Sequence, residues 1–189
     1  MGPARQCGTC GQAIVRFAYV AVALGVLTLW PASVGAAMYR NEDYGFSAEP
    51  PPSLAVCTTT PPGSNHGFEL LLETKDCEAN RVGHDWIDVY VGYNTIHEPA
   101  STRELASLEC RDAVVKHRVL VVREHVFDSC DIPDPERGRA FRYVALLGGG
   151  KVLSDISAEL LVTVYYSDRK RLPRYREIAE HVIRSFVFW

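Results

Sequence analysis

Six histidines are the residues of this sequence best suited to carry chemistry. Three of them, His66, His84 and His97, lie in segments that we expect to be loops bordering two strands of one sheet. Asp85 follows His84 and Glu98 follows His97, so a carboxylate stands beside an imidazole in two of these loops. If the loops converge, the three imidazoles could bind Zn²⁺ or Cu²⁺ through ring nitrogen, with carboxylates in support. Because the histidines have no fixed ligand spacing, solvated loop side chains are the simpler interpretation.

The tripeptide Asn65-His66-Gly67 has a structural and a functional interpretation. Asn and Gly favour sharp turns, so these residues can turn the chain into the strand that follows, with His66 bonding to backbone across the loop. The functional alternative is a recognition surface made of Asn65, His66, Tyr93 and Asn94. We take these four residues as the predicted binding site.

The sequence lacks the motifs of several well-known catalytic sites. Val152 follows Lys151 where a phosphate-binding P-loop requires Ser or Thr. Pro99 follows His97-Glu98 and removes the helix that an H-E-x-x-H zinc site needs. The loop histidines could also serve acid–base chemistry, but spacing pairs no nucleophile with them. We therefore predict no catalytic residue and no cofactor.

Residues 1–37 have the order of a secretory signal. Arg5 and Arg16 precede an apolar run at 17–29, and small residues follow this run. The whole segment contains no acidic residue. Cleavage after Ala36 or Ala37 fits this pattern. The alternative is an uncleaved anchor, because residues 17–39 carry no charge and are long enough to span a bilayer. The leader is the one segment through which we expect membrane contact.

Four cysteines follow the leader: Cys57, Cys77, Cys110 and Cys130. An even number in an exported chain indicates two disulfides, for which three pairings exist. We favour Cys57–Cys77 and Cys110–Cys130, because each pair closes a 20-residue interval between neighbouring elements. The alternative is a four-cysteine zinc site, although no two of these cysteines are close in sequence.

The spacing of apolar residues predicts the strands and helices that would position these side chains. Alternation of apolar and polar residues predicts strands at 44–48, 68–74, 86–94, 118–127, 139–147 and 153–167. Ser101 and Glu104 form a capping box that begins a helix expected to run to about Val115. Apolar residues at helical spacing predict a final amphipathic helix from Pro173 to Phe186. This order predicts an α+β fold, an antiparallel sheet flanked by helices, in a single domain at 38–189.

Composition narrows the function classes. The 189 residues are 47% apolar and 23% charged, which is ordinary for a globular protein and excludes a mainly disordered or coiled-coil chain. The net charge of −3 gives no basic field, so nucleic acid is not an expected partner.

Short motifs resemble those of a known family. Tyr44-Gly45-Phe46-Ser47 leads to Pro50, and the final helix closes as Ile183-Arg184-Ser185-Phe186. These patches resemble the PsbP-like superfamily. A cysteine, then Asn-His-Gly, a second cysteine and a strand ending in Tyr-Asn resemble more closely a group of uncharacterised exported bacterial members. The resemblance implies a three-layer α/β/α sandwich with binding and assembly roles, and it supplies no catalytic residue.

These observations together predict an exported, non-catalytic module that binds a protein partner or assists assembly, in the periplasm or outside the cell. The sheet face or the loops at 58–67 and 94–100 would hold the partner. Two alternatives stay open. One is a metal-binding protein or hydrolase built on the loop histidines. The other is an inhibitor or immunity-type protein that uses the 58–67 loop, pinned by a disulfide, to plug a partner's active site.

Overall fold

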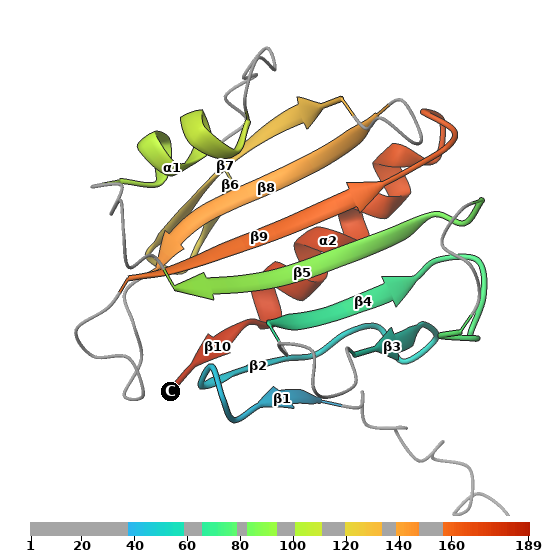
Figure 1. The fold of residues 1–189 in the computed structure, drawn as a ribbon, viewed down its shortest axis with the longest axis horizontal. Helices are drawn as coiled ribbons and strands as arrows, with labels where there is room; N and C mark the ends of the chain where they lie inside the picture. The colour runs from blue at the N-terminus through green and yellow to red at the C-terminus, as the bar shows by residue number, and fades with distance from the viewer. Residues whose placement is uncertain are drawn as a thin grey trace, which may run out of the picture. The chain divides into compact units, whose positions relative to one another are not determined.

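A computed structural model shows the fold (Figure 1). It describes residues 38–58, 66–78, 83–93, 101–110, 120–133, 139–147 and 157–189. The strands within these ranges are β1 (Tyr39–Asn41), β2 (Phe46–Ala48), β3 (Ala55–Cys57), β4 (Gly67–Leu71), β5 (Trp86–Tyr93), β6 (Leu120–Val122), β7 (His125–Ile132), β8 (Ala140–Leu147), β9 (Ala158–Tyr165) and β10 (Val187–Phe188). The helices are α1 (Thr102–Glu109) and α2 (Leu172–Ser185).

The strands form two antiparallel sheets. The larger has seven strands in the order β3-β4-β5-β9-β8-β7-β6, and the smaller has three in the order β1-β2-β10. The predicted α+β fold, an α/β/α sandwich flanked by helices, is wrong. The described part of the chain is mostly β, and it contains two helices rather than two helical layers. Two- and three-residue strands such as β1 and β10 are too short to show periodicity, which is why the sequence underestimates the β content.

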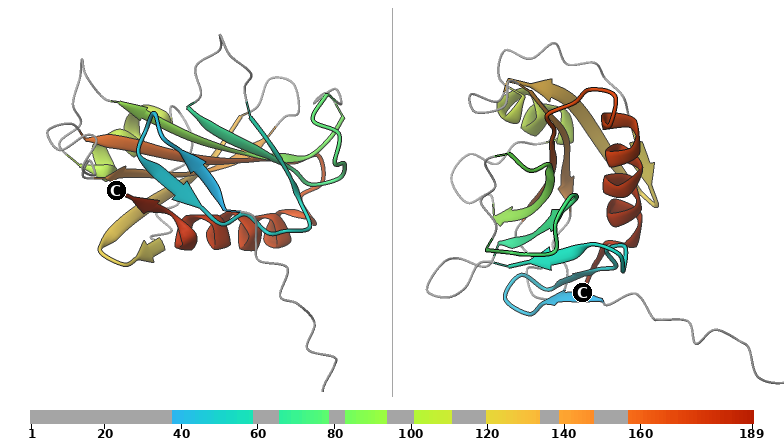
Figure 2. Two further views of the ribbon diagram at one scale, coloured as in Figure 1. Left: turned by 90° about the horizontal axis from the view of Figure 1, so that it is seen from below. Right: turned by 90° about the vertical axis from the view of Figure 1, so that its right-hand side faces the viewer.

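Helix α2 covers one face of the larger sheet (Figure 2). Its predicted apolar stripe is confirmed, since Tyr175, Ala179, Val182 and Ile183 are buried. They pack on alternate residues of the central strands, which the period of two directs to the same face. The chain end continues this core: the Phe186 ring stacks on Phe46, with centroids 4.7 Å apart.

Helix α1 packs at one end of the opposite face, against β7 and β8. Ser101 caps it as predicted, by accepting a hydrogen bond from the Glu104 amide at 3.2 Å. Leu105 and Ala106 are buried there, and Glu109 forms an ion pair of 2.6 Å with Arg142 of β8. No described helix packs over β4 or β5 on this face (Figure 1).

The predicted single strand at 118–127 is instead a hairpin, so this prediction is wrong. Strands β6 and β7 pair antiparallel, with Val122 opposite His125. Arg123 and Glu124 form the turn between them, and Arg123 has a φ of 56°. The chain reverses here without the Gly, Asn or Pro that ordinarily signals a turn, so the β-branched run looks continuous in sequence.

Both favoured disulfides are present. Cys57 bonds Cys77 across a Cα–Cα distance of 5.5 Å, and Cys110 bonds Cys130 across 6.1 Å. Two disulfides in a chain of this size fit an extracellular or periplasmic protein, because cytosolic thiols are kept reduced. Among the residues that the structure places, no helix combines the length and apolar character needed to cross a membrane.

Candidate functional site

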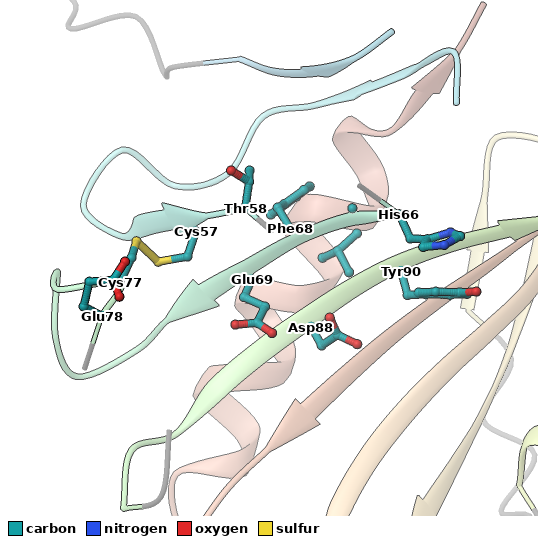
Figure 3. A pocket seen from close by; sticks show the side chains of 11 residues that line it. Cys57, Thr58, His66, Phe68, Glu69, Cys77, Glu78, Asp88 and Tyr90 are labelled. Carbon is teal, nitrogen blue, oxygen red and sulfur yellow. A yellow bond between two sulfur atoms is a disulfide. The ribbon is translucent and has the colours of Figure 1, made fainter. Parts of the chain in front are cut away.

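A recess of about 200 Å³ lies on the sheet face where none of the described helices packs over β4 and β5. The Cys57–Cys77 disulfide closes one end of it, and the rings of His66 and Tyr90 form the other (Figure 3). The acidic residues that line it are Glu69, Glu78 and Asp88. The recess is therefore bounded by aromatic rings, carboxylates and a disulfide.

Strand pairing explains why these side chains meet. Gly67 of β4 lies opposite Tyr90 of β5, and Glu69 lies opposite Asp88. Neighbouring positions such as Phe68 and Val89 point into the core against α2. Since side chains alternate along a strand, Glu69, Asp88 and Tyr90 must point to the other face, into the recess.

His66 enters the recess from the residue before β4. Its ring stacks on Tyr90 at a centroid distance of 5.0 Å and an interplanar angle of 25°. Nδ1 lies 2.6 Å from the Tyr44 hydroxyl and 3.2 Å from the Val91 carbonyl oxygen. The His66 carbonyl also accepts a hydrogen bond from the Val91 amide at 2.8 Å. The imidazole is thus held by its stacking, by Nδ1 and by its own backbone.

Gly67 permits the close approach of the two strands at this point. A Cβ on Gly67 would overlap the carbonyl oxygen of Val89. This position therefore requires glycine for lack of space, and the turn interpretation of Asn65-His66-Gly67 explains only part of its presence.

The two phenols of the site stay protonated in neutral solution. Burial, followed by the charge of Asp43, raises the pKa of Tyr44 above its ordinary value. Burial also raises the pKa of Tyr90, and the nearby Glu159 carboxylate contributes next. Both rings are therefore neutral, and the Tyr44 hydroxyl can donate to Nδ1 when that nitrogen is unprotonated.

The electrostatics of the recess favour a cation. Glu69, Glu78 and Asp88 supply carboxylates, while His66 is the one basic side chain among the described lining residues. The neutral ring of Tyr90 stacks on His66 with one face, and aromatic rings of this kind attract cations. This arrangement suits binding of an ammonium or guanidinium group.

Of the predicted binding residues, His66 lies in the recess. Tyr93 is the last residue of β5, with its backbone opposite Ala158. Asn65 and Asn94 fall outside the residues that the structure describes, as do most of the two loops proposed as docking segments.

The predicted metal ligands are placed in part. His66 precedes β4 and His84 precedes β5, and because these strands run antiparallel the two histidines lie at opposite ends of the pair. Nδ1 of His84 instead lies 3.8 Å from Oε2 of Glu73. His97 falls outside the described residues. Within the described ranges no three His, Cys, Asp or Glu side chains come together in a way that could hold a metal ion.

Sequence reasoning missed Tyr44, Glu69, Asp88 and Tyr90 as site residues. Alternation along each strand already placed Asp88 and Tyr90 on one face. The pairing of β4 with β5, and the position of Tyr44 beside them, required the structure.

No family model matches the sequence, and no curated protein matches it. The resemblance to PsbP-like proteins stays a prediction from short motifs, and the sandwich architecture that it implies differs from the two antiparallel sheets of this chain.

Proposed function

We propose that this protein is an exported, non-catalytic binding module whose recess on β4 and β5 receives a cationic side chain of a protein partner. The observation that carries the proposal is that Glu69, Asp88 and the stacked His66–Tyr90 pair line one recess. No described helix packs above this part of the sheet face. The motifs shared with PsbP-like proteins add support, since that resemblance implies binding and assembly.

An arginine side chain fits this chemistry best. Its planar guanidinium can stack on an aromatic ring while donating hydrogen bonds to a carboxylate. Glu69 and Asp88 are paired across the two strands, beside the stacked rings of His66 and Tyr90 (Figure 3). A charge-assisted hydrogen bond contributes about 1.5–3 kcal/mol, and a cation–π contact adds roughly 0.5–1 kcal/mol. One residue of a partner could thus supply a substantial part of the binding free energy.

Export belongs to the same proposal. The leader at 1–37 would direct the chain out of the cytosol and be cleaved after Ala36 or Ala37. The two disulfides support this route, because they persist in an oxidising compartment.

The test uses a minimal probe of the partner's side chain. We expect N-acetyl-arginine amide to shift the backbone amide NMR signals of His66 to Glu69 and of Asp88 to Tyr90 in a saturable titration. N-acetyl-citrulline amide is the matched control, because it keeps the shape of arginine and lacks the charge. Shifts confined to α2, or equal shifts with both compounds, would contradict the proposal.

A further inference from the structure

A second cavity, of about 370 Å³, lies at the other end of the molecule's core. Phe127, Leu147 and Leu160 of the larger sheet line it on one side, and Ile183 and Phe186 line it on the other. The β6–β7 turn forms its rim. This cavity shares no lining residue with the recess around His66, so a ligand bound in it would be independent of the proposed function.

The lining combines buried apolar side chains with exposed polar ones, so it suits an amphiphile better than a purely apolar ligand. Ligand pockets are commonly about 300–1,000 Å³ and mostly apolar, with a few polar groups that fix orientation. Here the polar groups gather at the rim, in the segment from Arg123 to His125. His125 lies opposite Val122, which packs against the core, so its side chain is on the cavity side of the hairpin.

Arg123 is held in a strained conformation at this rim. Its φ of 56° lies in the left-handed region, where a side chain with a Cβ is disfavoured and glycine is relaxed. Backbone strain of this kind gathers at ligand-binding positions. Glycine would make the turn without this strain but would lack the guanidinium, so the observed residue points to a role for the charge.

We propose that this cavity binds a single-chain amphiphile with a carboxylate head, such as a medium-chain fatty acid. The alkyl chain lies among the apolar side chains, and the carboxylate pairs with the Arg123 guanidinium, which matches its two oxygens. His125 adds a hydrogen-bond donor on the same side. Glu124 also lines the cavity, so the rim carries one carboxylate beside Arg123 and His125.

The first test compares two adjacent residues of β6. Val122→Trp places a large ring in the cavity, whereas Val121→Trp places the same ring on the outer face, where Val121 is 57% exposed. Aromatic side chains suit strands, so both variants are expected to fold. Isothermal titration with decanoate should show saturable binding to the wild type and to Val121→Trp. For Val122→Trp we expect binding to weaken at least about tenfold, equivalent to ~1.4 kcal/mol.

The second test separates binding from stability at Arg123. Arg123→Gly relieves the strain, so its Tm should rise by a few degrees while its affinity for decanoate falls. Decyltrimethylammonium, with the same chain and a cationic head, should bind the wild type more weakly than decanoate. A Tm gain with unchanged decanoate affinity, or equal binding of the two head groups, would overturn the assignment of Arg123.

Two further outcomes would overturn the proposal as a whole. One is the absence of saturable decanoate binding to the wild type. The other is flotation with phosphatidylglycerol vesicles that Val122→Trp abolishes, in a protein that does not bind free decanoate. That second result would assign the cavity to membrane lipid rather than to a free acid.

Discussion

His66 shows how single residues fix the geometry of the recess. Its ring is stacked on Tyr90, and its Nδ1 lies 2.6 Å from the Tyr44 hydroxyl. Gly67, the next residue, leaves room for the Val89 carbonyl and so lets β4 approach β5. Because the His66 side chain is already held in place, it loses little conformational entropy when a ligand binds, and this favours affinity.

Glu159 provides a prediction of pH dependence near the same face. It lies opposite Gly92, and a Cβ at Gly92 would overlap the Glu159 side chain. Burial raises the pKa of Glu159, and the Glu109 carboxylate raises it further. A raised folded-state pKa means that the native state favours the neutral acid, so this residue's contribution to stability falls as pH rises through that pKa. Glu159→Gln should therefore stabilise the protein near pH 7 and have little effect near pH 3.

Thermal unfolding of both proteins across this pH range measures the effect. Glu177→Gln, which removes an exposed carboxylate on α2, serves as the control and should show no such trend. A difference in Tm between Glu159→Gln and wild type that stays constant with pH would show that the charge on Glu159 carries no penalty.

At the scale of elements, the sequence predicts best where a regular period repeats. The strands around β4, β5, β8 and β9 and the stripe of α2 were predictable, because burial of one face imposes a period of two or 3.6. The Ser101 cap was predictable for a local reason, since its hydroxyl needs only an amide three residues away.

The elements that the sequence did not predict correctly lack such repeats. The β6–β7 turn consists of Arg123 and Glu124, which carry no turn signature, so its strands merged into one predicted strand. Strands β1 and β10 are defined by pairing with β2, a contact between the two ends of the domain that local pattern does not contain. The same reason hid most of the recess, whose residues come from separate strands.

The disulfides allow a prediction at this scale. Closing a loop of about 20 residues stabilises the folded state by roughly 3 kcal/mol in the chain-entropy model. Cys110 and Cys130 are 2% and 1% exposed and pack under α1, whereas Cys77 is exposed. The pair Cys110→Ala/Cys130→Ala should therefore lose more stability than Cys57→Ala/Cys77→Ala, because it also loses buried sulfur contacts. Urea unfolding of both double variants tests the order, and a larger loss for the second pair would contradict it.

On the scale of the whole molecule, the placement of the described helices determines where the proposed binding face lies. Helix α2 covers one face of the larger sheet, and α1 packs at one end of the other (Figure 2). On that other face, β4 and β5 carry the carboxylates and aromatic rings of the recess. The proposed binding face is thus the part of the sheet that no described helix covers.

The leader at 1–37 predicts the N-terminal residue of the mature protein. N-terminal sequencing of the protein recovered from the periplasm or medium should begin at Ala37 or Met38. Thiol titration of that material should find none of the four domain cysteines free. Recovery of the full chain from cytosol with reduced thiols would contradict the export route.

The central claim is that the recess on β4 and β5 binds a cationic side chain through its carboxylates. Isothermal titration of N-acetyl-arginine amide into wild type, Asp88→Asn and Glu177→Gln tests it most directly, because both variants remove one negative charge. We predict that Asp88→Asn weakens binding by about tenfold, or ~1.4 kcal/mol, while Glu177→Gln leaves it unchanged. Equal affinities for all three proteins would contradict the account.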